Sequence, residues 1–284
     1  MKKILISLVI ILFPLSFLLF PFNLSSIEVG GHLTEDTIWS PVNNPYLVID
    51  NIFVDSGVTL TILPGTVIKI QSAPLTGWQD YDDYFWYQNG NNLAKLFWVN
   101  GRIIAEGTQQ DSIIFTRMED DFDHYWGCIY IPEEADMCRF KHCRLEFSGS
   151  SGIWVGRIAK GAITLYNGLG IFENNTFWNN VSGLLIYYHC KTIEVAGNKL
   201  GYDDNINSFA EYLWKEQLTV AGPDEGYKTA LVAGNEFFND YTIYVSTINF
   251  VDNYISYHPS GWVISCQGYN DIAYFYDNSF YDCD

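Results

Sequence analysis

Gly161-Ala-Ile-Thr-Leu-Tyr166 is followed by Ile171-Phe-Glu-Asn-Asn-Thr-Phe177, and Gly183-Leu-Leu-Ile-Tyr-Tyr188 is followed by Ile193-Glu-Val-Ala-Gly-Asn-Lys-Leu200. These forty positions contain one pattern twice, and the pattern decides the fold. Each copy is a short run of strand-forming residues, a polar corner, and a second run that ends in Asn-x-apolar. The copies are about 22 residues apart, a period at which repeats stack into solenoids.

The Asn-x-apolar ending recurs down the C-terminal half of the chain. Its asparagines are Asn175, Asn198, Asn235, Asn253 and Asn278. Asparagine tolerates a left-handed backbone better than other residues with a side chain, so each one suits a sharp bend between two strands. Stacked asparagines also hydrogen-bond their side-chain amides along a stack. The repeat therefore predicts a structural asparagine ladder.

The composition favours one large all-β domain. Of the 284 residues, 48% are hydrophobic and 17% aromatic, and aromatic and β-branched residues favour strands. The formal net charge is −18, which argues against nucleic acid, a polyanion, as a partner. Cations, cationic surfaces and neutral glycans fit this charge better, although an acidic surface also serves simply to keep a strand-rich protein soluble.

Residues 1–26 are typical of a targeting segment. Lys2 and Lys3 precede a largely apolar run that continues to Phe22. The run indicates a signal peptide or, because it is long and lacks a small-x-small cleavage site, a retained N-terminal membrane anchor. In both cases we expect residues 27–284 to form one domain outside the cytoplasm, secreted, periplasmic or on the cell surface.

Short strands punctuated by Gly, Pro and Asn extend the pattern upstream. They include Val58-Thr-Leu-Thr-Ile-Leu-Pro-Gly-Thr-Val-Ile-Lys-Ile70, Val99-Asn-Gly-Arg-Ile-Ile-Ala-Glu-Gly-Thr108 and Asp111-Ser-Ile-Ile-Phe-Thr116. This series resembles the opening coils of secreted bacterial right-handed parallel β-helix repeat proteins of the pectin-lyase-like superfamily. The resemblance implies an all-β fold, a right-handed parallel β-helix or solenoid. It implies little about activity, because that fold carries lyases, hydrolases, epimerases, adhesins and non-catalytic repeats.

Two insertions are expected to interrupt the coils, at about 72–92 and 201–228. The first combines acids with large aromatic rings, which are unusual on a surface without a binding role. Its candidate carbohydrate-binding residues are Trp78, Tyr81, Tyr84 and Trp86. The second contains Ser208-Phe-Ala-Glu211, a capping box that predicts a short helical insertion. Insertions in solenoids tend to share one face, often the binding face.

One acidic segment is a candidate metal site. Glu119-Asp-Asp-Phe-Asp-His124 places several carboxylates ahead of a strand, and hard oxygens grouped in this way hold Ca²⁺. The candidate ligands are Asp120, Asp121 and Asp123. The segment lacks the glycine-anchored spacing of an EF-hand, and the sequence indicates no cofactor other than Ca²⁺.

Catalytic signatures are weak. Lys141, His142, Arg144 and Arg157 form the nearest approach to a basic cluster, but outward strand positions ordinarily carry solvated charges. Gly201-Tyr-Asp-Asp204 weakly resembles the Gly-x-Asp-Asp of polygalacturonase-like enzymes, whose other signatures are absent. No catalytic residue is therefore assigned.

The six cysteines leave two interpretations open. Outside the cytoplasm Cys128, Cys138, Cys143, Cys190, Cys266 and Cys283 can pair as disulfides. Alternatively, Cys128 and Cys143 stack in the core of neighbouring coils as buried thiols. The last coil, which ends at Asp284, would expose strand edges, so it predicts a docking partner there.

Three functions follow from these observations. We expect a secreted or surface-exposed, non-catalytic β-helix protein whose partner is a polysaccharide or a surface protein. One alternative is an enzyme, a polysaccharide lyase or glycoside hydrolase acting on acidic glycans. The other is a structural spacer or adhesin segment.

Overall fold

The fold is all-β. The computed structural model describes residues 26–74, 94–121, 124–149, 154–155, 157–158, 161–166, 168–180, 183–187, 192–201, 216–220, 230–238, 242–245, 248–251, 253–258, 264–266 and 274–283. Within these ranges the regular elements are strands, apart from one turn of 3-10 helix, η2 (Pro41–Asn43). No helix among the described residues is long and apolar enough to cross a bilayer.

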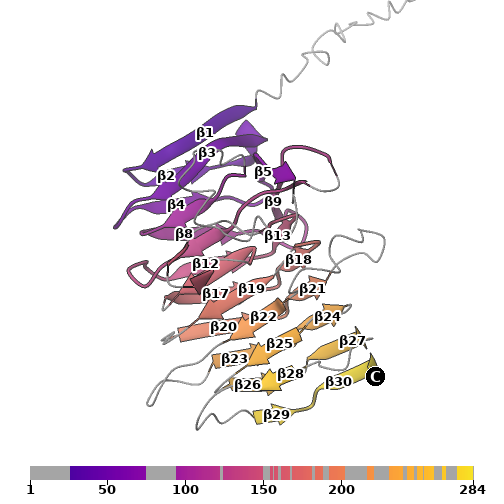
Figure 1. Ribbon diagram of the computed structural model, residues 1–284. Coiled ribbons are helices and arrows are strands. Elements are labelled where there is room, and N and C mark those ends of the chain that lie inside the picture. Colours follow the sequence, from indigo (N-terminus) through magenta and orange to yellow (C-terminus); the bar gives the residue numbers. More distant parts are fainter. Residues whose placement is uncertain are drawn as a thin grey trace, which may run out of the picture.

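The strands form long parallel ladders, of which the first is a sheet of its own. Its members pair in parallel in the order β2 (Thr37–Trp39), β4 (Thr59–Ile62), β8 (Arg102–Glu106), β12 (Cys138–Lys141), β17 (Leu169–Glu173), β20 (Thr192–Ala196), β23 (Ala230–Ala233), β26 (Ile248–Val251) and β29 (Tyr274–Tyr276). We call it the first ladder. It runs from the N-terminal to the C-terminal end of the molecule (Figure 1).

A second, larger sheet curls and contains two more parallel ladders. The second ladder is β5 (Val67–Ile70), β9 (Ile113–Arg117), β13 (Cys143–Glu146), β18 (Thr176–Trp178), β21 (Lys199–Gly201), β24 (Glu236–Phe238), β27 (Tyr254–His258) and β30 (Ser279–Cys283). The third ladder is β7 (Phe97–Val99), β11 (Ile129–Ile131), β16 (Ile163–Tyr166), β19 (Leu184–Tyr187), β22 (Glu216–Val220), β25 (Thr242–Val245) and β28 (Ile264–Cys266).

The curl of this sheet comes from strand β3 (Tyr46–Val54), which belongs to both ladders. Its first residues pair with β5 and its last residues pair with β7. Strand β1 (Ile27–Leu33) lies along the whole of β3 and closes the N-terminal end. Two short antiparallel pairs lie outside the ladders, β6 (Ala73–Pro74) with β10 (His124–Tyr125) and β14 (Trp154–Val155) with β15 (Arg157–Ile158).

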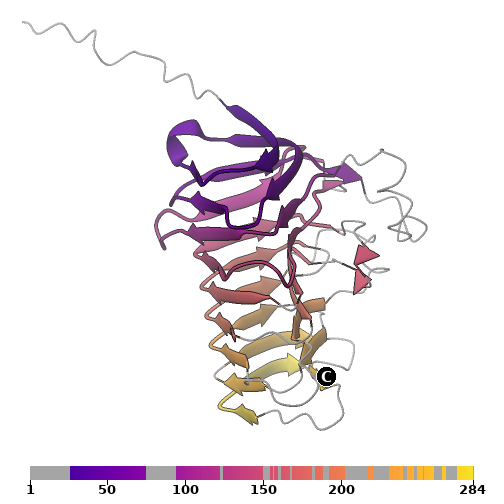
Figure 2. The same ribbon diagram turned by 90° about the vertical axis from the view of Figure 1, so that its left-hand side faces the viewer.

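The chain visits the ladders in the same order each time: first, second, third. Each circuit therefore lays its strands beside those of the circuit before, as Figures 1 and 2 show. The prediction of an all-β fold with parallel strands is confirmed, and the arrangement is compatible with the expected β-helix. Parallel strands need crossover connections, and here the strands of the other ladders serve as those crossovers.

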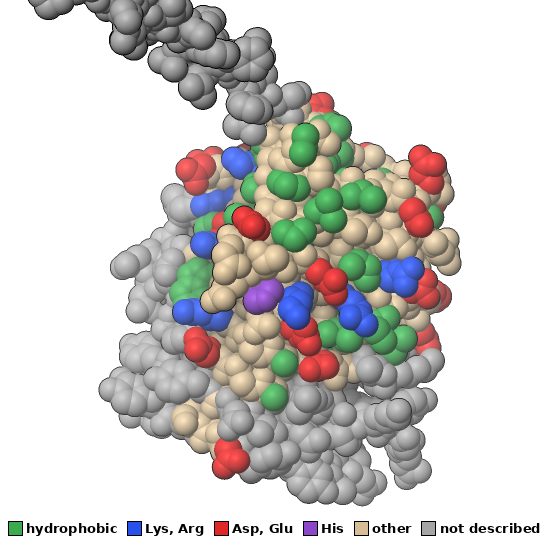
Figure 3. Space-filling model, turned by 180° about the vertical axis from the view of Figure 1, so that it is seen from behind, with side chains coloured by type: hydrophobic (Ala, Val, Ile, Leu, Met, Phe, Trp, Pro, Cys, Tyr) green, Lys and Arg blue, Asp and Glu red, His purple; other side chains and the backbone are tan. Residues whose placement is uncertain are grey.

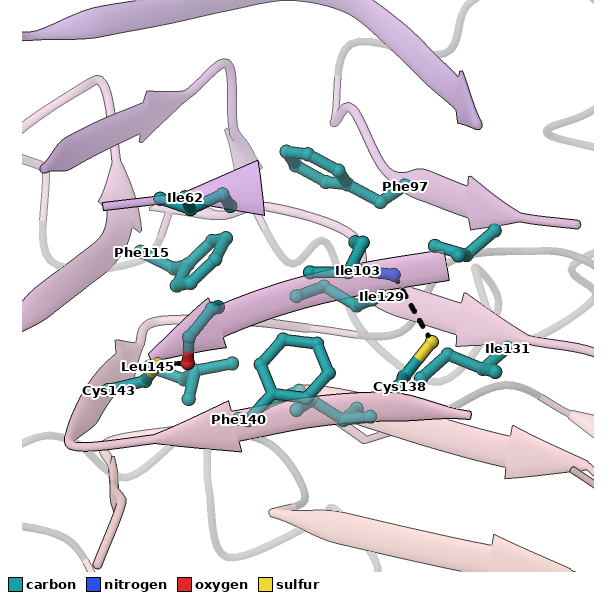
Figure 4. Close-up of a cluster of buried hydrophobic side chains, with 14 of the residues drawn as sticks. Ile62, Phe97, Ile103, Phe115, Ile129, Ile131, Cys138, Phe140, Cys143 and Leu145 are labelled. Carbon is teal, nitrogen blue, oxygen red and sulfur yellow. Dashed lines mark hydrogen bonds between the residues drawn. The ribbon is translucent and has the colours of Figure 1, made fainter. Parts of the chain in front are cut away.

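The core lies between the ladders. Strands such as β4 and β5 alternate between half-buried and buried positions, because successive side chains of a strand point to opposite faces. Phe97, Phe115 and Phe140 come from three different ladders and meet in this interior, where Figure 4 shows them with the surrounding aliphatic side chains. The ring centroids of Phe140 and Phe172 lie 5.8 Å apart and nearly parallel.

The asparagines expected to form a ladder hydrogen-bond in series at the corner between the first and second ladders. The Nδ2 of Asn175 donates to Oδ1 of Asn198 at 3.0 Å, and that of Asn198 to Oδ1 of Asn235 at 3.0 Å. The series continues through Asn253 to Asn278. Each Oδ1 also accepts the backbone N–H of the preceding asparagine. The column thus satisfies polar groups that the corner buries.

The left-handed bend expected at these asparagines occurs one residue earlier. Asn174 (φ 55°), Gly197 (φ 64°), Gly234 (φ 62°) and Asp277 (φ 58°) precede the ladder residues and carry the positive φ. His142 (φ 48°) holds the same place before Cys143, whose backbone N–H donates to Oδ1 of Asn175 at 2.9 Å. The bend at the earlier residue turns the next side chain inward, which is why the asparagine amide is buried.

The expected insertion at 201–228 is wrong in its extent. Residues Glu216–Val220 form strand β22, which pairs in parallel with β19 and β25 in the third ladder. The alternating β-branched and apolar residues of this run outweigh the helix-start signal upstream. That signal, Ser208 to Glu211, lies outside the described residues, as does the helix expected there.

Three cysteines are buried and form no disulfide, Cys128, Cys138 and Cys143. The expected stacking of Cys128 on Cys143 is wrong, because Cys143 opens β13 in the second ladder whereas Cys128 precedes β11 in the third. Cys138 and Cys143 face the core and contact the backbone of β8 (Figure 4). The side chains of Cys190, Cys266 and Cys283 lie outside the described part of the chain.

These core thiols predict a loss of stability in alkali. Burial raises the pKa of Cys138 from 9.0 to about 12 and raises the pKa of Cys143 as well, because a dry core disfavours the thiolate. Below pH 9 the thiols are neutral in the folded and unfolded chain. Above pH 9 only the unfolded chain releases the protons, so the free energy of unfolding falls by about 1 kcal/mol per thiol between pH 9 and pH 10.

Urea unfolding at both pH values measures this loss. The double variant Cys138→Ala, Cys143→Ala is the control, because it keeps every other titrating group and is expected to show a shallower pH dependence. An unchanged slope in that variant contradicts the prediction.

Candidate functional site

The longest connections between consecutive strands of the ladders all start at one corner. They lie between β5 and β7, between β9 and β11, between β13 and β16, and between β21 and β22. All of them join the second ladder to the third, and we call this place the insertion corner. The first expected insertion, and residues 202–215 of the second, depart from here; residues 221–229 instead join the third ladder to the first.

At the insertion corner the connection that follows β5 is hydrogen-bonded to the connection that follows β9. The carboxylate of Glu119 accepts a hydrogen bond from the backbone N–H of Ser72 at 2.8 Å and another from the Ser72 hydroxyl. Beside them Ala73 and Pro74 pair antiparallel with Tyr125 and His124. The start of the first insertion is therefore held against the acidic segment of the next circuit.

Arg117 lies at the centre of the corner. Its side chain is 10% exposed, and its Nη1 donates to the carbonyl of His124 at 3.2 Å. The guanidinium lies 3.8 Å from the centroid of the Phe147 ring, a cation–π contact. Phe147 has φ 58°, an uncommon conformation for a bulky residue that stores strain. Arg117 thus links the acidic segment to the strained turn after β13.

The candidate calcium ligands are only partly described. The carboxylate of Asp120 lies 3.9 Å from Arg117 and is fully exposed, and Oδ2 of Asp121 lies 3.7 Å from Nδ1 of His124. Asp123 lies outside the described residues. Among the residues that the structure does describe, no group of three or more His, Cys, Asp or Glu side chains is arranged to hold a metal. The calcium site stays a prediction.

An aromatic column runs along the outer side of the third ladder beside this corner. We give this name to His32, Phe53, Trp98 and Tyr130. The rings of His32 and Phe53 stack with centroids 4.7 Å apart, and those of Trp98 and Tyr130 meet edge-on at 4.9 Å. Strand register places Phe53 opposite Trp98 and Trp98 opposite Tyr130. His32 is exposed, and Phe53 and Trp98 are half-buried.

The inner end of the column holds an unsatisfied polar group. Tyr130 is 2% exposed, yet its hydroxyl has no hydrogen-bond partner. Cys128, Trp98 and Tyr166 pack around it, and burial raises the pKa of Tyr130, so the hydroxyl stays protonated. Buried hydroxyls normally have a hydrogen-bond partner. The Tyr130 hydroxyl is an exception.

The sequence-predicted carbohydrate-binding residues, Trp78, Tyr81, Tyr84 and Trp86, lie outside the described residues. Their segment leads into β7, which carries Trp98. The aromatic column itself was missed from the sequence. Its signal is a repeated triplet with an aromatic residue between two apolar ones: Ile52-Phe53-Val54, Phe97-Trp98-Val99 and Ile129-Tyr130-Ile131.

Two of the basic residues considered for catalysis form ion pairs away from the insertion corner. Lys141 lies 3.2 Å from Glu173, and Arg144 pairs with Glu146. His142 lies between them at the corner of the first and second ladders. Figure 3 shows positive and negative side chains interspersed on the face that it draws. The side chain of Arg157, and Asp203 and Asp204, lie outside the described part.

No protein-family model, no curated protein and no solved structure matches the chain.

Proposed function

We propose that this protein is an extracytoplasmic right-handed parallel β-helix of the pectin-lyase-like kind, and that it binds carbohydrate without transforming it. The observation that carries the binding proposal is the aromatic column. Its rings are held on rigid parallel strands. Phe53, Trp98 and Tyr130 lie opposite one another on neighbouring strands, so their spacing is that of the strands. The β-helix proposal draws its support from the repeated order of the three ladders.

Carbohydrate suits the column for chemical reasons. The faces of aromatic rings pack against the C–H faces of sugar rings, and rings on adjacent strands lie about 4.8 Å apart, so one sugar can contact two of them. The half-buried Phe53 and Trp98 offer the accessible ring surface, while the buried Tyr130 packs against Trp98 from the next strand. A net charge of −18 favours neutral over acidic glycans.

The insertion corner supports the same proposal. The aromatic-rich first insertion begins at a point fixed by Ser72 and Glu119 and ends just before Trp98. Trp78 and Trp86 lie outside the described residues, and we propose that they contact the same ligand because their segment leaves and rejoins the strands beside the column. Binding residues of solenoids are commonly carried on such loops.

The test is a glycan array with the full-length protein, followed by titration calorimetry on the best neutral ligand. Replacing Trp98 by alanine is expected to weaken binding about tenfold, because a buried aromatic anchor contributes at least 1.4 kcal/mol. Trp178→Ala is the matched control, since Trp178 also points outward but lies in the second ladder, and it is expected to leave the affinity within about twofold.

Loss of affinity in both variants to the same extent contradicts the assignment of the column. If no glycan on the array binds, and if the protein instead captures a surface protein in a way that Trp98→Ala abolishes, the ligand is a protein and not a carbohydrate. Release of reducing or unsaturated sugar from the bound polymer would contradict the non-catalytic part of the proposal.

A further inference from the structure

The exposed large hydrophobic side chains of the described residues gather at one end of the molecule. They are Ile27, Ile38, Val42, Ile49 and Leu63. All belong to the first circuits, beside the N-terminal end. Val42 is 85% exposed and Ile38 is 66% exposed. Figure 3 shows hydrophobic side chains clustered on the part of the surface nearest the N-terminal end. The concentration at one end separates this patch from hydrophobic residues scattered singly.

Three of these residues share one corner, and we call them the apolar cap: Ile38, Val42 and Leu63. Ile38 lies on β2, the outermost strand of the first ladder. Val42 belongs to η2, which follows β2. Leu63 follows β4, and its backbone N–H donates to the carbonyl of Trp39 at 2.9 Å, which ties it to the end of β2.

The sequence next to this end indicates what covers the cap. Residues 4–22 contain no Asp, Glu, Lys or Arg and are mostly apolar, and they stop shortly before β1 begins at Ile27. Strand β1 is the terminal strand of the curled sheet and pairs along the whole of β3. Whatever receives the apolar segment therefore lies close to the end of the molecule that exposes Ile38 and Val42.

The charges near the cap specify the chemistry of that surface. No lysine or arginine occurs between residues 4 and 68, whereas Glu28, Glu35 and Asp36 are exposed there. Basic side chains are what draw a protein to anionic lipid, and those of the first circuits, Lys69, Lys95 and Arg102, are half-buried rather than exposed. A neutral, zwitterionic surface is the one compatible with an apolar cap among carboxylates.

We propose that the apolar cap rests on the headgroup boundary of a zwitterionic lipid bilayer in which residues 4–22 are retained as an anchor. Apolar side chains at such a boundary insert by a few ångströms. The ladders then lead away from the bilayer, with the aromatic column and the insertion corner along their sides. The proposal depends on retention of the N-terminal segment and not on glycan binding.

Spin-label accessibility in the full-length protein tests the contact directly. Val42→Cys is labelled with a nitroxide and the protein is reconstituted in phosphatidylcholine vesicles. Collision with oxygen, which concentrates in lipid, is expected to exceed collision with a water-soluble nickel complex by several-fold. Cys128, Cys138 and Cys143 are buried, and the labelled unsubstituted protein provides the background from other thiols.

Gln109→Cys is the matched control. Gln109 is exposed and occupies the same corner between the first and second ladders, further along the stack. Its label is expected to prefer the nickel complex. An equal preference for the nickel complex at both positions overturns the proposal, as does an unsubstituted protein that does not float with vesicles.

Two further outcomes are decisive. Strong spin–spin broadening at position 42 that persists in detergent assigns the cap to a second copy of the chain and overturns the proposal. Oxygen accessibility at position 42 that rises when phosphatidylglycerol is added contradicts the charge argument. Glycan affinity is expected to be unchanged in Val42→Cys, so failure of this proposal and failure of the proposed function are separate results.

Discussion

Replacing Phe140 by alanine is expected to lower the free energy of unfolding by about 4 kcal/mol, because truncating a buried phenylalanine leaves a cavity. Phe140 is fully buried, stacks on Phe172 and lies 6.4 Å, centroid to centroid, from Phe115. Figure 4 shows its ring among side chains from several strands. Because those strands are hydrogen-bonded on both sides, they cannot collapse into the space. Urea unfolding followed by tryptophan fluorescence measures the loss.

Two variants make the Phe140 result specific. Phe140→Leu keeps most of the volume and is expected to lose about 1 kcal/mol. Ile104→Ala removes an outward-facing, half-buried side chain from the neighbouring strand β8 and is expected to lose less than about 1 kcal/mol. A loss in Phe140→Ala no larger than that in Ile104→Ala contradicts the assignment of this residue to the core.

Replacing Asn198 by alanine is expected to cost about 3 kcal/mol, since it leaves more than one buried polar group without a partner. The Oδ1 of Asn198 accepts hydrogen bonds from the backbone N–H and the Nδ2 of Asn175. Its Nδ2 donates to the carbonyl of Phe172 at 2.8 Å. None of these groups has access to water as a substitute, because both asparagines are about 1% exposed.

Hydrogen exchange shows where Asn198→Ala weakens the structure. The Asn175 amide is expected to lose protection in Asn198→Ala, while amides of β4 keep theirs, because circuits of a repeat stack interact with their neighbours only. Asn174→Gly is the control: Asn174 is exposed with φ 55°, a conformation that suits glycine, so its stability is expected to change by less than about 0.5 kcal/mol. Equal losses at positions 174 and 198 refute the role of the ladder.

Several features could be predicted from the sequence because they are local and periodic. The alternation of apolar residues gave the strands, and the regular return of Asn-x-apolar gave the column from Asn175 to Asn278. Each copy of either signal spans only a few residues. The all-β fold with parallel strands follows from them, while the right hand of the coil and the pectin-lyase-like family stay predictions.

Other features were misjudged because a tertiary contact outweighs the local signal. Residues Glu216–Val220 were assigned to the second insertion, but backbone pairing on both sides makes them strand β22. The left-handed residue was expected at each asparagine, but it is the residue before, and the bend there turns the asparagine side chain inward. Stacking of Cys128 on Cys143 was one of two interpretations, but the chain carries these residues to different ladders.

The sequence by itself determined which side chains point inward and that the strands repeat, because both depend on the two-residue period of a strand and on corner residues that bend the chain. Only the tertiary structure decided which residues of different circuits become neighbours. Phe53, Trp98 and Tyr130 meet in the aromatic column, and Arg117 lies over Phe147, because parallel pairing sets the register between circuits whatever the length of chain between them. Register is a property of hydrogen bonds between distant strands, so no local pattern encodes it.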